Sequence, residues 1–109
     1  MKKCLFYGSL KRGKYNYQRF PGQEFVQNVQ LPGYDLYNLG PYPAACAGDG
    51  VLQAELHEIP LAVFNLIHRM EIGAGYYEAE VKVNDEPVSI FLMPANRLKK
   101  SEKINSGAW

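Results

Sequence analysis

The amino-acid sequence predicts an α+β fold, a small mixed β-barrel or partly closed sheet with one or two flanking helices. Several short segments have strand-like composition and are separated by glycine and proline, which interrupt regular structure. Residues 60–73 differ, because their apolar side chains recur at helical spacing. The chain has 109 residues, enough for one hydrophobic core but not for two. We therefore expect one domain over residues 1–109, in which the polar tail 94–109 docks back through its final tryptophan.

The N-terminal part is expected to begin with a strand and a loop. Residues 3–7 include the start of an apolar run that suits a fully buried strand. A basic loop with two glycines follows, and a short helical or irregular stretch near residues 15–20 ends at Pro21-Gly22. Residues 24–29 are expected to form the next strand.

Turn signals divide the middle of the chain. Pro32-Gly33 is expected to turn the chain into residues 34–39. Residues 40–43 contain two prolines and should form an irregular segment across a surface or the mouth of a pocket. Asp49-Gly50 is a strong turn pair ahead of a strand over residues 51–58. In that strand the apolar Leu52, Ala54 and Leu56 alternate with the polar Gln53, Glu55 and His57.

One helix and two strands are expected in the last part of the chain. Pro60 suits the first helical position, and Gly73 and Gly75 suit the end. The apolar stripe consists of Val63, Leu66, Ile67 and Met70. Residues 77–83 alternate as a half-buried strand, residues 84–87 turn, and residues 88–93 form the final strand.

Composition limits the classes of function. The net charge is +1, whereas proteins that bind nucleic acid or membrane surfaces usually carry a clear basic excess. No segment approaches the roughly 20 apolar residues of a membrane-spanning helix, and the N-terminus lacks the apolar stretch of a signal peptide. Cys4 and Cys46 lie in apolar surroundings and are expected to be reduced, buried thiols. We therefore expect a cytoplasmic protein that binds neither nucleic acid nor membrane. The oligomeric state stays open.

The first candidate site is the turn at Tyr7-Gly8-Ser9-Leu10, where a buried strand ends at a glycine. A glycine lets the backbone approach a ligand closely, and the amides after it can converge on an anion. Residues 8–14 also fit the G-x-x-x-x-G-K pattern of a phosphate-binding loop. However, Tyr15 stands where that loop needs a hydroxyl for Mg²⁺, and no second parallel unit follows. Lys11, Arg12 and Lys14 therefore form either a solvated loop or a rim that attracts anions.

The second candidate is Glu71. It follows Ile67 by four residues, so helical spacing carries it to the edge of the apolar stripe. A partly desolvated carboxyl there would have a raised pKa and act as a base near neutral pH, although an exposed charge at a helix end is the simpler reading. His57 and His68 do not form a metal-binding pattern with any other residues, so no metal is expected.

Four segments, in this order, resemble the γ-glutamylcyclotransferase-like family, which includes the γ-glutamylamine cyclotransferases and the AIG2-like proteins. Residues 7–10 resemble its Y-G-[ST]-L loop, and residues 34–44 resemble its G-Y-x-L-Y-x-L-G-x-Y-P-A segment. Arg69-Met70-Glu71 ahead of Gly75-Tyr76-Tyr77 resembles the helix that ends in the catalytic glutamate. Residues 104–109 resemble a C-terminal S-G-D-W signature.

The resemblance implies a small mixed β-barrel and intramolecular aminolysis at its mouth. The α-amine of a γ-glutamyl group attacks its own γ-carbonyl, and 5-oxoproline and a free amine or amino acid result. It implies that Glu71 is the catalytic acid and base, that Tyr7, Gly8, Ser9, Leu10 and Tyr77 contact the substrate, and that no cofactor is needed. The alternatives are a non-catalytic metabolite-binding module on the same fold, or a hydrolase or acyl-transfer variant.

Overall fold

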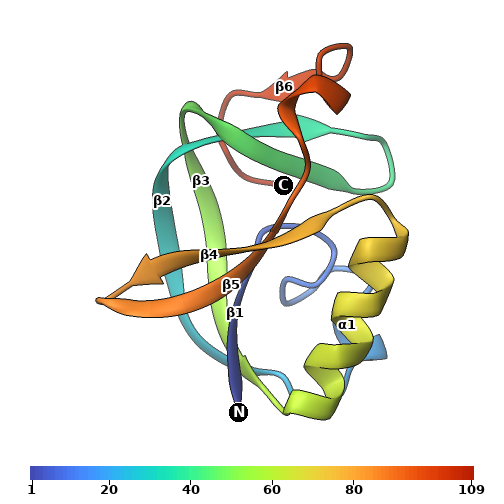
Figure 1. Cartoon of the computed structure of the whole chain (residues 1–109), viewed down its shortest axis with the longest axis vertical. Helices are drawn as coiled ribbons and strands as arrows, with labels where there is room; N and C mark the ends of the chain where they lie inside the picture. The colour runs from blue at the N-terminus through green and yellow to red at the C-terminus, as the bar shows by residue number, and fades with distance from the viewer.

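The computed structural model describes all 109 residues and shows a mixed sheet curled into a half-barrel, with one α-helix beside it (Figure 1). The predicted fold class is confirmed. The sheet has the order β4-β5-β1-β3-β2-β6, in which β1 is antiparallel to β3 and parallel to β5. The strands are β1 (Lys2–Phe6), β2 (Glu24–Asn38), β3 (Pro43–Ile59), β4 (Tyr77–Val83), β5 (Glu86–Leu92) and β6 (Glu102–Ile104). The helices are α1 (Leu61–Gly73) and the 3₁₀ turns η1 (Tyr17–Arg19) and η2 (Ala95–Arg97).

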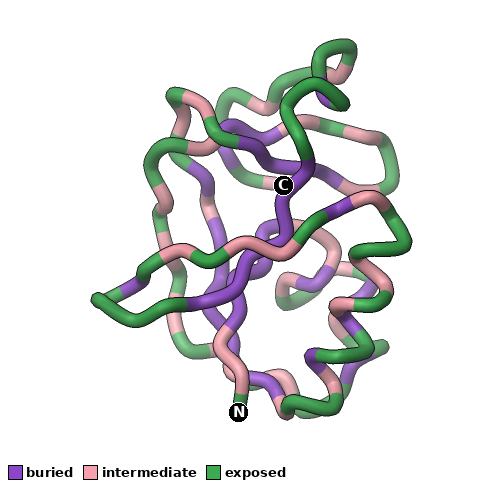
Figure 2. The backbone as a smooth tube through the Cα atoms, in the orientation of Figure 1, coloured by how far each residue is buried: buried purple, intermediate pink, exposed green.

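The central strand β1 is buried on both faces, which explains its continuous apolar run. Cys4 and Phe6 face the part of the core that α1 covers, while Leu5 and Tyr7 face the part on the other side of the sheet. Figure 2 shows the buried segment continuing through β1 and the neighbouring β5. The end of β1 is thereby fixed on both sides, and the loop after it starts from a rigid position.

The predicted turns at Pro32-Gly33 and Asp49-Gly50 are wrong, because β2 and β3 run through both as two long bent strands (Figure 1). The partner on β3 changes from Val51 to Ala47 while β2 advances only from Pro32 to Tyr34, so residues 48–50 form a bulge. The real turn joins residues 38 and 43, where the backbone amide of Leu39 donates to the carbonyl of Tyr42.

Asp35 explains why glycine lies in that bulge. Its Oδ1 accepts a hydrogen bond from the amide of Gly50 at 2.9 Å, and a Cβ atom on Gly48 would stand 2.0 Å from its Oδ2. The turn-type residues 48–50 therefore make room for a carboxylate that fills the bulge. An Asp-Gly pair is found both in hairpin turns and in β-bulges, so the local sequence alone does not show which of the two structures forms.

The helix α1 begins one residue after Pro60, and its buried face differs from the predicted stripe. Phe64 and Ile67 are buried, and Val63 and Met70 pack partly against the same core. Leu66 is 54% exposed, so its place in the predicted stripe is wrong. No helix has both the length and the apolar character needed to cross a membrane.

The predicted polar side of β3 is also wrong at its C-terminal end. His57 is 0% exposed and Glu55 is 9% exposed. The rings of Phe6, Tyr17 and Phe25 surround the imidazole of His57, with centroids 5.3, 6.1 and 5.8 Å away. The loop after β1 and the start of β2 cover this face of β3. The alternation of polar and apolar residues within one strand cannot predict that other segments bury its polar face.

The C-terminal segment packs along β2 and β3. Strand β6 pairs with β2, and the amide of Gln53 donates to the carbonyl of Gly107 at 2.8 Å. Trp109 packs against the core on the side away from α1, and Lys11 Nζ donates to its backbone oxygen at 3.0 Å. Both cysteines are buried and unpaired, as predicted.

Candidate active site

Glu71 and the loop after β1 line one cavity. Its empty volume is about 360 Å³, which includes the part open to solvent. The end of β1 and its loop supply residues 5–10 of the lining. The β2–β3 turn supplies Tyr42 and Pro43, the end of α1 supplies Glu71, the segment between α1 and β4 supplies Tyr76, and β5 supplies Phe91. Residues far apart in the chain thus meet around one apolar hollow with a single carboxyl group.

Glu71 lies in the last turns of α1, one turn after the fully buried Ile67. Burial in the cavity raises the pKa of its carboxyl from 4.5 to about 7. Its carboxylate takes part in no hydrogen bond or ion pair within the chain, whereas its backbone carbonyl accepts from the amides of Ala74 and Tyr76. The backbone is therefore held firmly, and the carboxyl is free to exchange a proton near neutral pH.

The loop opposite Glu71 offers backbone donors. The amides of Gly8, Ser9 and Leu10 donate no hydrogen bond within the chain. The next amide, of Lys11, closes a turn on the carbonyl of Gly8 at 3.0 Å. Three successive free N–H groups in the lining of one cavity form a candidate site for a carboxylate or a developing oxyanion.

Asn16 does not line the cavity but holds Ser9, a role that the sequence did not predict. It is 6% exposed, and its Nδ2 donates to Ser9 Oγ at 2.8 Å while its backbone amide donates to the Ser9 carbonyl at 3.0 Å. Because Ser9 Oγ accepts from Asn16, its own hydroxyl proton remains free to donate into the cavity. Asn16 follows Ser9 by seven residues, and no pattern in the sequence connects the two.

Gly8 is required by a neighbour within the chain. A Cβ atom at this position would stand 2.9 Å from Cδ of Pro43, closer than real Cβ contacts. The sequence predicts that another group approaches the backbone closely at Gly8. The structure shows such a close approach, and the approaching group is the ring of Pro43. The contact seats the β2–β3 turn against the loop, and it places Tyr42 and Pro43 at the cavity, where the irregular segment 40–43 was expected to lie.

The tyrosines near the helix end and the loop differ in whether they line the cavity. Tyr7 lines the cavity, donates from its hydroxyl to the carbonyl of Phe91 at 2.6 Å and accepts from the amide of Ala45 at 3.1 Å. Tyr76 also lines it and donates to the carbonyl of Pro43 at 2.5 Å. Burial raises the pKa of both phenols well above the ordinary value, so these hydroxyls hold the walls in place. Tyr77 is 45% exposed at the start of β4 and lies outside this lining.

The other candidate groups lie elsewhere. Lys11 and Lys14 reach towards Trp109, with Lys14 Nζ 5.5 Å from the centre of its ring, and neither lines the cavity. His68 Nδ1 is paired with Glu78 at 2.9 Å. No three His, Cys, Asp or Glu side chains gather where they could hold a metal ion.

Residues 4–109 match the family model described as gamma-glutamyl cyclotransferase, AIG2-like. The Pyrococcus horikoshii protein PH0828, which is named as a candidate gamma-glutamylcyclotransferase, is 32% identical over 101 residues, or 93% of this chain and 84% of that protein. The Escherichia coli protein YtfP, named as a gamma-glutamylcyclotransferase family protein, is 26% identical over 98% of this chain and 95% of that protein.

Solved structures agree with this comparison. The crystal structure of PH0828 superimposes with a TM-score of 0.84 at 28% identity, and covers 99% of this chain and 89% of that one. The solution structure of YtfP gives a TM-score of 0.77 at 23% identity, covering 98% and 95%. A part of the Kluyveromyces lactis allophanate hydrolase has the same fold, with a TM-score of 0.79 at 18% identity over 99% of this chain and 20% of that one.

Proposed function

The chain belongs to the gamma-glutamyl cyclotransferase, AIG2-like family, and from this premise we propose that it releases 5-oxoproline from a small γ-glutamyl substrate by intramolecular aminolysis. One observation carries the proposal. An unpaired carboxyl with a pKa of about 7 shares a cavity with three free backbone amides. A proton acceptor opposite a set of fixed donors is what an acyl transfer needs when nucleophile and electrophile belong to the same molecule.

In the proposed reaction, Glu71 removes a proton from the substrate α-ammonium group. The freed amine attacks the γ-carbonyl carbon, a C–N bond forms, and the carbonyl oxygen becomes an oxyanion. Glu71 then gives its proton to the leaving nitrogen, and the oxyanion re-forms the carbonyl as the bond from that nitrogen to the γ-carbon breaks. The extra proton on the new ring nitrogen passes to the departing amine. The products are 5-oxoproline and a protonated amine or amino acid, and the chemistry requires no cofactor.

Gly8, Ser9 and Leu10 are the proposed donors to the substrate. Their amides would hold the α-carboxylate or the oxyanion, and the Ser9 hydroxyl adds a donor that Asn16 orients. Tyr7 would wall the pocket. The placement of Tyr76 in the cavity favours it as the second aromatic wall, in the role expected for Tyr77. The apolar surroundings strengthen these interactions because they exclude water.

The proposal is tested with a panel of γ-glutamyl amines, γ-glutamyl amino acids and γ-glutamyl peptides. Release of 5-oxoproline and of glutamate is measured separately by chromatography. We expect 5-oxoproline from at least one class and no glutamate. Glutamate release would indicate a hydrolase on the same site. Saturable binding without either product would indicate a metabolite-binding module.

The pH dependence of kcat/KM should report Glu71. The carboxylate form is the active base, and its pKa is raised to about 7. We therefore expect kcat/KM to rise with pH through a midpoint near 7 rather than near the ordinary value of 4.5, and to level off above it. Initial rates in buffers of constant ionic strength measure the midpoint. A rate that is already constant between pH 5 and 8 would show that this carboxyl is not the base.

A further inference from the structure

The proposed chemistry makes no use of Glu55, although this residue carries a buried charge close to the loop. Glu55 lies in β3, opposite Phe6 at the end of β1, and is 9% exposed. A carboxylate in such a position is unfavourable unless hydrogen bonds compensate for the loss of water. The hydrogen-bond partners of the Glu55 carboxylate therefore show which segment of the chain this residue restrains.

Both carboxylate oxygens of Glu55 bind Arg12, which lies in the loop after β1. Oε1 accepts from the backbone amide of Arg12 at 3.0 Å, and Oε2 accepts from Arg12 Nε at 3.3 Å. The guanidinium group of Arg12 also stacks on the ring of Phe25, 3.4 Å from its centre. The loop is thus tied through one residue to both β3 and β2.

His57 completes the arrangement. Burial lowers the pKa of its imidazole, so the ring is neutral at pH 7. Its Nδ1 has no partner, and its Nε2 lies 3.0 Å from Glu55 Oε1, which can only accept. Nε2–H therefore donates to Glu55. Burial alone would raise the pKa of Glu55, but the Arg12 amide, His57 and the Arg12 charge outweigh it and lower that pKa, so the carboxylate stays ionised.

The anchored residue is close to the free amides. The turn from Gly8 to Lys11 is closed by one backbone hydrogen bond, and Arg12 follows directly. On the other side of the loop, Asn16 holds Ser9. If Arg12 were released, the loop would lose its tie to β3, and the Ser9–Asn16 contacts, the short turns, the buried Leu10 and the Lys11–Trp109 hydrogen bond would remain.

We propose that Glu55 is a positioning residue, which holds the loop through Arg12 so that the amides of Gly8, Ser9 and Leu10 face the cavity. The inference rests on the proposed function for its catalytic consequence. Its structural part, the anchoring of the loop, is independent of that function and has its own measurement.

Three variants separate the possibilities. Glu55→Ala removes both acceptors, and Glu55→Gln keeps one acceptor for the Arg12 amide but loses the charge. Glu58→Ala is the matched control, because Glu58 is on the same strand and pairs with Lys3, 3.9 Å away, instead of with the loop. Amide hydrogen exchange and steady-state kinetics are measured for all three.

For Glu55→Ala we expect exchange at the Arg12 amide to speed up about tenfold or more, since a charged hydrogen bond is lost, with β1 and α1 unchanged. We expect kcat/KM to fall about 10- to 100-fold, as small misplacements of binding groups do. The pH midpoint near 7 should stay in place, because Glu71 is untouched. Glu55→Gln should lie between Glu55→Ala and the wild type, and Glu58→Ala should resemble the wild type.

Two results would overturn the inference. Unchanged exchange at Arg12 in Glu55→Ala would show that the loop is not anchored there, whatever the activity. Faster exchange with unchanged kcat/KM would show that the anchor has no role in positioning. If the wild type released 5-oxoproline from no substrate, the proposed function would fail, while the exchange measurement would still decide the anchor. Glu55→Gln provides the same comparison if Glu55→Ala does not fold.

Discussion

Replacing Glu71 by glutamine is expected to lower kcat for 5-oxoproline release by about 100- to 10,000-fold, the usual contribution of a general acid and base. Glutamine has nearly the same size and fits the same position at the end of α1, but it cannot take a proton from the substrate ammonium group. KM should change less than kcat, because the loop amides, which are the proposed donors to the substrate, are unchanged. The rate is followed by chromatographic detection of 5-oxoproline.

The same substitution should stabilise the protein above neutral pH. The folded-state pKa of Glu71 is about 7 and its ordinary value is 4.5, so between these values the folded state binds more protons than the unfolded state. Stability of the wild type therefore falls as pH rises from 4.5 to about 7. Glu71→Gln lacks this loss, and at pH 8 we expect a gain of about 1–3 kcal/mol in urea unfolding.

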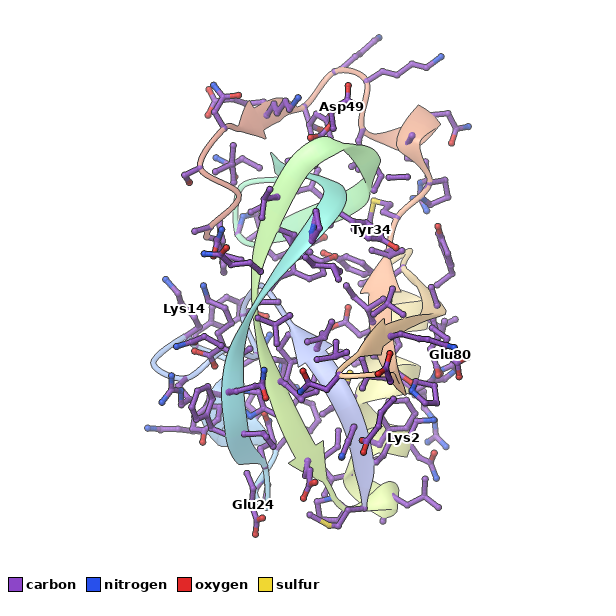
Figure 3. The ribbon with its side chains drawn as sticks, turned by 90° about the vertical axis from the view of Figure 1, so that its left-hand side faces the viewer. Lys2, Lys14, Glu24, Tyr34, Asp49 and Glu80 are labelled. Atoms are coloured by element: carbon purple, nitrogen blue, oxygen red, sulfur yellow. The ribbon has the colours of Figure 1, made fainter.

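The matched control is Glu80→Gln. Glu80 is exposed on β4, and Figure 3 shows it on the opposite flank of the molecule from Lys14 of the loop. We expect activity and stability close to wild type for this variant. Full activity of Glu71→Gln would remove Glu71 from the mechanism. Lost activity with a large loss of stability would instead point to a structural role.

The second large effect is expected at Gly107, where alanine should destabilise the fold by about 2–5 kcal/mol. The residue has φ +71°, a conformation unfavourable for residues with a Cβ atom, and that atom would stand 1.9 Å from the backbone oxygen of Val51. The neighbouring hydrogen bond from the Gln53 amide to the Gly107 carbonyl, which joins the C-terminal segment to β3, would be displaced. Urea unfolding at constant pH measures the loss.

Gly13→Ala separates the two causes. Gly13 has φ +79°, close to that of Gly107, but nothing lies within 4 Å of the position its Cβ would take. We expect this variant to lose only about 1–2 kcal/mol from the backbone conformation. Equal losses in the two variants would mean that the C-terminal segment moves freely to accept a side chain and is not tightly docked on β3.

Local sequence was sufficient where a pattern depends on neighbouring residues alone. The strand over residues 77–83 and the helix that carries Glu71 follow from periodicity, and the turn after β4 follows from Asn84 and Asp85, whose φ angles are +53° and +63°. It failed where a distant group decides the conformation. Asp35 converts the expected turn at Asp49-Gly50 into a bulge, and a covering loop buries Glu55 and His57.

The candidate site divides in the same way. The sequence by itself determined the family, the carboxyl at the end of the helix and the glycine turn after the first strand, because each is carried by residues adjacent in the chain. Only the tertiary structure decided that Glu71 is desolvated to a pKa of about 7, that Tyr76 and not Tyr77 lines the cavity, and that Asn16 and Glu55 hold the loop. Desolvation of a carboxyl and restraint of a loop depend on contacts with segments that are distant in the sequence. The spacing of residues along one strand or helix does not predict those contacts.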